Sequence, residues 1–224
     1  MNVTITGATG LIGRRVAKIA LASNHRVYAL GRRSVAGLPP GAQTAVWDAL
    51  AGPPPGEALY GADAVVHLAG EPVAQRWTAE AKQRILDSRV LGTRRLVEAL
   101  AAREPRPAVL VSASAVGYYG SRGDEILTEP TAPGSGFLAE VCQAWEAEAD
   151  RAAEWGIRVV KLRIGVVLAE GGGALARMVP VFRAFLGGRV GSGRQWMPWI
   201  HLEDLAALVL HLVTHPVSGA VNAV

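Results

Sequence analysis

The sequence predicts an α/β fold in which a doubly wound parallel sheet carries helices on both faces. Strand-like and helix-like patterns alternate along most of the 224 residues, which is typical of this fold class. A glycine-rich turn joins the first strand to the first helix. Half of the residues are hydrophobic, enough for a packed core, yet no apolar run approaches the ~18 residues that would span a membrane.

The first strand, the turn and the start of the first helix are predicted from residues 2–13, which read NVTITGATGLIG. Gly7, Gly10 and Gly13 have the spacing of a dinucleotide-binding turn. The first glycine allows a sharp turn, the second lets the backbone approach a pyrophosphate, and the third lets the helix pack against the strand. Free N–H groups at the start of the helix would face the phosphates, whose charge the helix dipole favours. The alternative is an ordinary glycine turn of an α/β protein.

The second strand is predicted over residues 26–30, and the residues after it indicate which dinucleotide would bind. A cofactor without a 2′-phosphate usually meets an acidic residue at this point. Here the strand is followed by Gly31, Arg32, Arg33 and Ser34, with no acid. Guanidinium groups suit a 2′-phosphate, because charge-assisted hydrogen bonds are worth about 1.5–3 kcal/mol each. The predicted cofactor is therefore NADP(H), and the alternative is a solvated arginine pair on a turn.

Strands and helices continue to alternate after the second strand. Ligands of such sheets bind outside the carboxyl ends of the strands, near the point where the strand order reverses. Further strands are predicted at residues 44–47, 64–68, 108–112 and 158–162, and helices at residues 78–102 and 137–155. The candidate pocket consists of the residues just beyond the strand ends, namely Gly7, Arg32, Asp48, 68–70, 112–114 and 163–166.

Two units are expected, a Rossmann-type cofactor-binding domain over residues 1–165 and a partial substrate-binding lobe over residues 166–224. Within the lobe, residues 171–173 predict a glycine hinge and residues 174–186 an amphipathic helix. The strand pattern at the end of the chain indicates a product truncated within the lobe. The loop after the helix suits a phosphate and a planar or sugar ring, unless its tryptophans merely anchor it. Its candidate substrate-binding residues are Arg194, Trp196 and Trp199.

Composition and charge narrow the classes of function. The formal charge is +4, but the basic residues occur in pairs rather than in a stripe, so we expect an anionic small molecule and no nucleic acid. The single cysteine excludes an internal disulfide, and without a cluster of Cys and His no metal site is expected. The first strand starts directly after Met1, so we expect a cytoplasmic protein without a signal peptide or membrane partner. A homodimer is left open.

Several segments together resemble the short-chain dehydrogenase/reductase superfamily in its extended, sugar-nucleotide-epimerase-like form. They are TGATGLIG, VVHLAG, SRVLGT, VSASAVGYYG and PWIHLEDLA. The combination of EPVAQRW, SRVLGT, FLAEVCQAWE and GSGRQWMPWIHLEDLA is similar to an atypical epimerase-like subgroup. The resemblance covers essentially the whole chain, and it is far more specific for fold and cofactor than for the reaction.

The resemblance implies a role by position for each candidate cofactor-binding residue. For Asp48 a purely structural role in a turn is an equal alternative. The implied contacts are Gly7, Gly10, Leu11, Ile12 and Gly13 with the pyrophosphate, Arg32 and Arg33 with the 2′-phosphate, Asp48 near the adenine, and Leu68, Ala69 and Gly70 along the adenosine and phosphates.

The chain departs from the superfamily at the catalytic pair. The superfamily uses Tyr-x-x-x-Lys, in which the ammonium lowers the pKa of the tyrosine that serves as acid or base. None of the four tyrosines is followed by lysine at this spacing. Alignment on Glu146 puts Leu138 at the tyrosine position and Cys142 at the lysine position. Arg89 also stands where the superfamily has an asparagine, and both replacements are typical of the atypical subgroup. Arg89 is therefore a further candidate cofactor-binding residue, which could supply the positive charge that Cys142 lacks and hydrogen-bond the ribose or the nicotinamide end.

The candidate catalytic residues are Ser114, Tyr118 and Cys142. Ser114 matches the superfamily serine that contacts a substrate carbonyl or hydroxyl. Tyr118 or Tyr119 could place a phenol over the nicotinamide, and Glu71 could act as a base if it were partly desolvated. The thiolate of Cys142 could act as a base or a redox sensor, although a helical cysteine is more often a small buried residue.

Two functions from different classes are compatible with these residues. The first is an NADP(H)-dependent oxidoreductase or epimerase that acts on a small carbonyl or nucleotide-sugar-like substrate by an atypical mechanism. The second is a catalytically silent NADP(H)-binding protein that reports redox state to a partner. Ser114 and the tryptophan-containing loop favour the enzyme, whereas the missing Tyr-Lys pair favours the silent protein.

Overall fold

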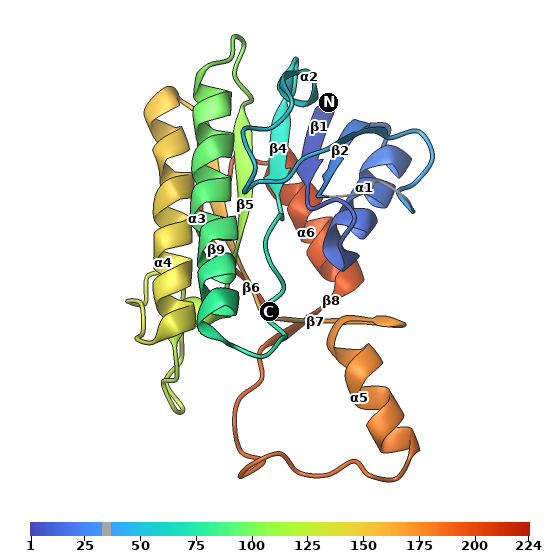
Figure 1. Ribbon diagram of the computed structural model, residues 1–224, viewed down its shortest axis with the longest axis vertical. Helices are drawn as coiled ribbons and strands as arrows, with labels where there is room; N and C mark the ends of the chain where they lie inside the picture. Colours follow the sequence, from blue (N-terminus) through green and yellow to red (C-terminus); the bar gives the residue numbers. More distant parts are fainter. Residues whose placement is uncertain (33–36) are drawn as a thin grey trace.

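The computed structural model describes residues 1–32 and 37–224, which form one large sheet covered by helices (Figure 1). The seven strands of this sheet are all parallel. They have the order β3-β2-β1-β4-β5-β6-β9, where β1 is Asn2–Thr6, β2 Arg26–Gly31, β3 Gln43–Val46, β4 Ala64–His67, β5 Val109–Ala115, β6 Arg158–Ile164 and β9 Gly219–Ala223. The predicted doubly wound α/β fold is confirmed.

Helices cover both faces of the sheet. Helices α1 and α6 pack against each other on one face, and α3 and α4 pack against each other on the other (Figure 1). A short second sheet pairs β7 with β8, and α5 follows β7. The remaining bounds are α1 Leu11–Ala22, α2 Gly56–Leu59, α3 Ala79–Ala101, α4 Phe137–Asp150, β7 Val166–Ala169, α5 Gly173–Arg183, β8 Trp199–His201 and α6 Leu202–Thr214.

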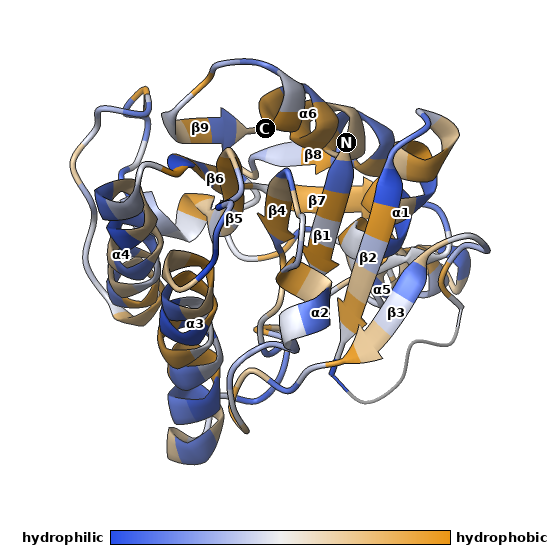
Figure 2. Cartoon of the chain, turned by 90° about the horizontal axis from the view of Figure 1, so that it is seen from above, coloured by the Kyte–Doolittle hydropathy of each residue, from blue (hydrophilic) through white to orange (hydrophobic). Residues whose placement is uncertain are grey.

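The core has two parts because the central strands are buried on both faces. Val66 of β4 packs into the cluster beneath α1 and α6, while its neighbour Val65 packs into the cluster beneath α3. Parallel strands of this kind are near-continuously apolar, since successive side chains point to opposite faces. In Figure 2 the central strand β4 is accordingly mostly orange, whereas the edge strand β3 is mixed and α3 and α4 carry both blue and orange residues.

Two strands extend further than the sequence predicted, and one helix is shorter. Strand β5 continues to Ala115 and β6 to Ile164, so Ser114 lies within a strand, paired in register with Arg163. Residues 113–115 are small or polar, so the local sequence does not mark them as a strand. They belong to β5 because they pair with residues 162–164 of β6. Helix α4 gives way to a 3₁₀ helix over Arg151–Trp155 rather than continuing to residue 155.

The second half of the chain is divided between the large sheet and a projecting segment. Helix α6 and strand β9 belong to the large sheet and its helical layer, although both follow residue 165. Helix α5 instead packs mainly on β7, has no buried residue, and projects with the loop after it away from the body (Figure 1). In the described part of the chain no helix combines the length and apolarity needed to cross a membrane.

Candidate functional site

The glycine-rich turn between β1 and α1 is sterically constrained in the way that a dinucleotide site requires. Gly7 has φ +66°, and a Cβ atom there would lie 2.6 Å from the Leu68 carbonyl oxygen. A Cβ atom on Gly13 would collide with the Gly7 carbonyl. Both positions therefore exclude other residues, for the physical reasons that the spacing predicted.

The amino end of α1 is open to an anion. Its first residue is Leu11, and Gly10 before it provides no side-chain cap. The first turn also contains no acidic residue. Free N–H groups and the positive end of the helix dipole thus remain available to a phosphate, and no carboxylate competes with it.

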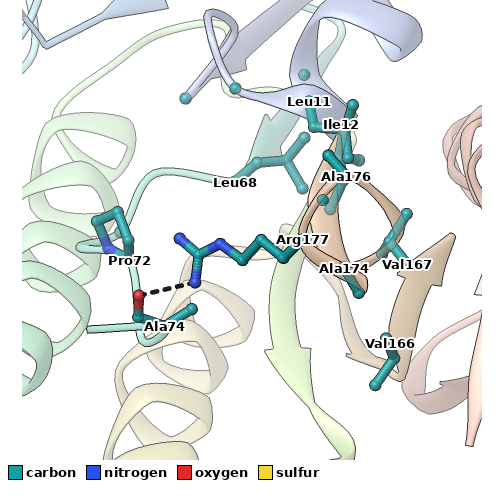
Figure 3. A pocket seen from close by; sticks show the side chains of 15 residues that line it. Leu11, Ile12, Leu68, Pro72, Ala74, Val166, Val167, Ala174, Ala176 and Arg177 are labelled. Carbon is teal, nitrogen blue, oxygen red and sulfur yellow. Dashed lines mark hydrogen bonds between the residues drawn. The ribbon is translucent and has the colours of Figure 1, made fainter. Parts of the chain in front are cut away.

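A cavity of about 730 Å³ opens over this turn, and a smaller one of about 200 Å³ adjoins it. Both include the glycine turn and the segment after β4, where the strand order reverses between β1 and β4. The larger cavity is lined by Gly7, Gly10, Leu11, Ile12, Gly13, Leu68, Gly70, Pro72, Ala74, Val166, Val167, Gly173, Ala174, Ala176 and Arg177 (Figure 3). The smaller one is lined by Gly7, Thr9, Gly10, Arg32, Trp47, Asp48, Ala49, Leu50, Leu68, Ala69, Gly70, Glu71, Pro72 and Ser88.

Arg32 lies at the smaller cavity and pairs with Glu71. Its Nη1 donates to Glu71 Oε2 over 2.6 Å, and half of its side chain is exposed. This hydrogen bond lowers the pKa of Glu71, which is therefore ionised at neutral pH and engaged in an ion pair. The pairing makes Glu71 a poor candidate for a catalytic base. The predicted contacts of Arg33 and Ser34 lie outside the described residues.

Asp48 has the structural role in a turn that the sequence offered as one alternative, and it also lies at the smaller cavity. It lines the smaller cavity, and its Oδ1 accepts a hydrogen bond from the backbone N–H of Leu50 over 3.0 Å. This is the local turn expected of an aspartate, which bonds to its own backbone two residues further on. The carboxylate is thereby held at the cavity wall while it stabilises the turn.

His67 is a structural residue of the site that the sequence analysis missed. It is fully buried at the end of β4, with Nδ1 2.7 Å from Thr6 Oγ1 and Nε2 3.0 Å from Thr93 Oγ1. Burial lowers the pKa of His67 to about 4, and the charge of Arg89 acts in the same direction. The neutral ring ties β1, β4 and α3 together next to the segment of residues 68–70 that lines both cavities. The only signal in the sequence is a histidine within an apolar strand.

Arg89 lies against the same segment, packed behind Gly70. Its Nη1 donates to the carbonyls of Glu71 (3.0 Å) and Ile85 (3.1 Å), and its guanidinium lies 5.0 Å from the centre of the Trp145 ring. A Cβ atom on Gly70 would approach the guanidinium to 3.2 Å. Burial lowers the pKa of Arg89. Arg89 thus orders the backbone on which the cofactor would rest.

Ser114 belongs to a buried ionic network. Its Oγ donates to Glu146 Oε1 over 2.7 Å, and Glu146 accepts two further hydrogen bonds, each of 2.9 Å, from Nε and Nη2 of Arg163. Only 4% of the Arg163 side chain and 6% of that of Glu146 are exposed. Although burial opposes its charge, the hydrogen bonds to Glu146 raise the pKa of Arg163. The sequence placed Arg163 beyond a strand end but did not identify Glu146 as its partner.

The two adjacent tyrosines surround the same guanidinium. The Tyr118 ring lies 3.5 Å from Cζ of Arg163 and meets the Tyr119 ring edge to face. The hydroxyl of Tyr119 accepts from Nη1 of Arg163 over 2.9 Å and donates to Oδ1 of Asn222 over 2.7 Å. The network therefore joins β5, β6 and β9 at their carboxyl ends.

Cys142 lies buried on α4 beside this network. Burial raises the pKa of its thiol, even though the neighbouring Ser114 hydroxyl and Arg89 charge favour the thiolate. The thiol is therefore neutral at physiological pH. Its environment is that of a small packed residue rather than of an activated nucleophile.

The loop with the predicted substrate contacts does not reach either cavity. Trp196 is 75% exposed and donates from Nε1 to Asp124 Oδ1 over 2.8 Å, and Arg194 and Trp199 are exposed as well. None of the three lines the described cavities. The cation at the larger cavity is instead Arg177, which the sequence analysis did not single out. Among the described residues, no group of three or more potential metal ligands was found.

Comparisons with known proteins agree with this architecture. The chain is 41% identical over 235 residues to the chloroplastic epimerase family protein SDR39U1 homolog of Arabidopsis thaliana, covering 99% of this chain and 65% of the relative. It is 38% identical to a nucleoside-diphosphate sugar epimerase from Corynebacterium glutamicum, with a TM-score of 0.82 over 99% of this chain and 46% of that one. It is 34% identical to human epimerase family protein SDR39U1 in a crystal structure with NADPH, with a TM-score of 0.85 over 100% of this chain and 74% of that one.

The family relation follows from these likenesses and from one further match. The model of the NAD-dependent epimerase/dehydratase family matches residues 3–224, nearly the whole chain. The parallel sheet with its reversal of strand order agrees with this match. The chain belongs to the NAD-dependent epimerase/dehydratase family.

Proposed function

We propose that this protein binds NADP(H) and acts on a small carbonyl or nucleotide-sugar-like substrate without a Tyr-Lys pair. The observation that carries the proposal is the paired cavity over the glycine turn, with the guanidinium of Arg32 at the end of β2, where an NAD-binding site would have an acid. The human relative whose crystal structure contains NADPH supports the choice of cofactor. The name of the Corynebacterium relative supports a nucleotide-sugar-like substrate.

The residues present fit the cofactor in three places. The open amino end of α1 and the turn at Gly7 would take the pyrophosphate, Arg32 the 2′-phosphate, and Asp48 the neighbourhood of the adenine. The nicotinamide, when bound, supplies the capacity to accept or donate a hydride. The chain itself would bind and orient the cofactor, and Leu68, Val166 and Val167 supply an apolar wall of the cavity.

The orientation of the Ser114 hydroxyl limits what it can do for a substrate. Because its proton is donated to the carboxylate of Glu146, the oxygen can accept a hydrogen bond but does not donate a second one. A substrate group that reached Ser114 would therefore be a hydroxyl or another donor, as in the oxidation of an alcohol. Arg163 positions Glu146 and thereby fixes this orientation.

A specific observation favours the second candidate, a silent NADP(H)-binding protein. Two of the groups that could move a proton are already engaged: the Cys142 thiol is buried and neutral, and the Tyr119 hydroxyl donates to Asn222. Such a protein would bind the cofactor with the same residues and change partner affinity with its redox state.

Binding and turnover distinguish the two functions. Binding of NADPH and NADH is measured by nicotinamide fluorescence, and turnover is followed at 340 nm with a library of carbonyl compounds, alcohols and nucleotide sugars. For the enzyme, we expect turnover that falls in Ser114→Ala while NADPH affinity stays within about twofold of the parent. NADPH binding without turnover of any member identifies the silent protein, and absence of NADPH binding refutes both.

A further inference from the structure

Arg177 is the only residue with a polar side chain among the described residues that line the larger cavity. The other lining residues are Gly, Ala, Val, Leu, Ile and Pro. Arg177 comes from α5, and its guanidinium extends across the cavity toward the segment between β4 and α3 (Figure 3). A single cation in an otherwise apolar cavity of about 730 Å³ indicates an anionic group in the ligand.

The guanidinium of Arg177 uses few of its N–H donors in hydrogen bonds within the described part of the chain. Its one hydrogen bond within the described part of the chain runs from Nη1 to the carbonyl oxygen of Ala74 over 3.1 Å. A guanidinium carries five N–H donors in a planar fork that matches two phosphate oxygens at once. Arg177 is therefore able to bind a phosphate and still span the two walls of the cavity.

The glycine turn and the start of α1 form another wall of this cavity. The Gly10 N–H is already bonded to the Gly7 carbonyl, so the amino end of α1 supplies only the backbone N–H groups of its first turn and a partial charge. A pyrophosphate bound there carries about two negative charges, which the helix dipole of roughly half an elementary charge neutralises incompletely. Arg177, although its side chain is exposed, is the described cation at this cavity that could compensate part of the remainder.

Resting on the proposed function, we infer that Arg177 binds the pyrophosphate of the dinucleotide together with the amino end of α1. Helix α5 then acts as a movable wall, since none of its residues is buried and it packs mainly on β7. Cofactor binding would hold this wall against the segment that contains Ala74 and thereby shape the space beside the nicotinamide. The site thus has two separate cations, Arg177 for the pyrophosphate and Arg32 for the 2′-phosphate.

Substitution of Arg177 and substitution of Arg32 should change the affinities for different ligands. The pyrophosphate is common to NADPH and NADH, so Arg177→Met weakens both by about tenfold and leaves their affinity ratio unchanged. Arg32→Ala weakens NADPH selectively and lowers the ratio. Adenosine 2′-monophosphate, which has no pyrophosphate, binds Arg177→Met as it binds the parent but binds Arg32→Ala more weakly.

The measurement is fluorescence titration with each dinucleotide, with adenosine 2′-monophosphate measured by calorimetry. Arg183→Met is the matched control, because Arg183 is exposed in the last turn of the same helix and lines neither described cavity. Arg177→Lys keeps the charge but not the planar fork, so it recovers only part of the affinity. Circular dichroism melting checks that each variant is folded.

Each outcome decides the inference. Loss of affinity for both dinucleotides in Arg177→Met, with Arg183→Met like the parent, supports it. Equal affinities of parent and Arg177→Met overturn it while leaving NADP(H) binding intact. A change confined to NADPH assigns Arg177 to the 2′-phosphate and also overturns it. If the parent binds neither dinucleotide, the proposed function and this inference both fail.

Discussion

The buried His67 predicts a specific dependence of stability on pH. Its pKa in the folded protein is about 4, while an unfolded histidine titrates near 6.5. Below pH 6.5 the unfolded chain therefore binds a proton that the folded protein does not take up until the pH approaches 4. Stability is fully present above pH 6.5 and is lost progressively as the pH falls from 6.5 to 4.

The size of this effect follows from the difference between the two pKa values. A difference of about 2.5 units corresponds to about 3 kcal/mol at 1.36 kcal/mol per unit, of which about 2 kcal/mol is lost between pH 7 and pH 5. The structural reason is that both ring nitrogens lie within hydrogen-bond distance of threonine hydroxyls in a site without water access. For a chain of this size, about 2 kcal/mol corresponds to a fall in Tm of about 4 °C.

Urea unfolding of the parent and of His67→Gln at pH 7, 6, 5.5 and 5 measures how much His67 contributes to the pH dependence of the free energy of unfolding. The variant is less stable at pH 7 because it disturbs the contacts with Thr6 and Thr93, but its stability declines by about 2 kcal/mol less between pH 7 and pH 5. The other histidines are common to both proteins and cancel in the comparison. An independent check is the NMR signal of the His67 ring, which should not titrate above pH 5. Parallel pH profiles for parent and variant, or a ring that titrates near pH 6.5, would refute the reasoning.

Three further predictions concern the charged groups of the site. Arg32→Ala lowers the preference for NADPH over NADH by about 1.5–3 kcal/mol in fluorescence titration, the range of one charge-assisted contact, and an unchanged preference would remove Arg32 from the 2′-phosphate site. Arg89→Ala weakens binding of NADPH by about 1–3 kcal/mol in the same titration, because the backbone next to Gly70 loses its hydrogen bond to the guanidinium. Cys142→Ala changes the NADPH affinity little, and a larger loss of affinity in Cys142→Ala than in Arg89→Ala would contradict this assignment. Glu146→Leu leaves the Arg163 charge buried and unpaired, so urea unfolding should show a loss of about 3–5 kcal/mol; if Glu146→Leu with Arg163→Met is as unstable as the single variant, the pair is not coupled.

Local steric and chemical rules determined the first part of the fold and of the cofactor site. The positive φ of Gly7 and the clash that a Cβ atom on Gly13 would make with the Gly7 carbonyl both arise within one strand, one turn and one helix, so they are visible in a short stretch of sequence. The alternation of apolar strands and amphipathic helices likewise predicted the class of fold. The absence of an acid after β2 is equally a local observation. These features need no knowledge of distant contacts. The clash of a Cβ atom on Gly7 with the Leu68 carbonyl, by contrast, comes from the distant segment after β4.

Tertiary structure alone decided which charged groups meet. Glu146 and Arg163 lie 17 residues apart, Ser114 and Glu146 lie 32 apart, and nothing in the local pattern of either segment indicates their contact. The same holds for Arg177, which reaches a carbonyl 103 residues away across the cavity. A residue's partner depends on the packing of whole elements, and many pairings are compatible with one local sequence.

The placement of the last hundred residues shows the same division. The sequence predicted a strand at the end of the chain and a helix after residue 173, and both exist. It did not reveal that β9 pairs with β6 in the large sheet or that Trp196 bonds to Asp124 rather than lining a described cavity. Strand pairing depends on backbone hydrogen bonds, and every residue except proline can form them, so the sequence does not indicate which strands pair. Secondary structure, by contrast, can be predicted from the local pattern of apolar and polar side chains.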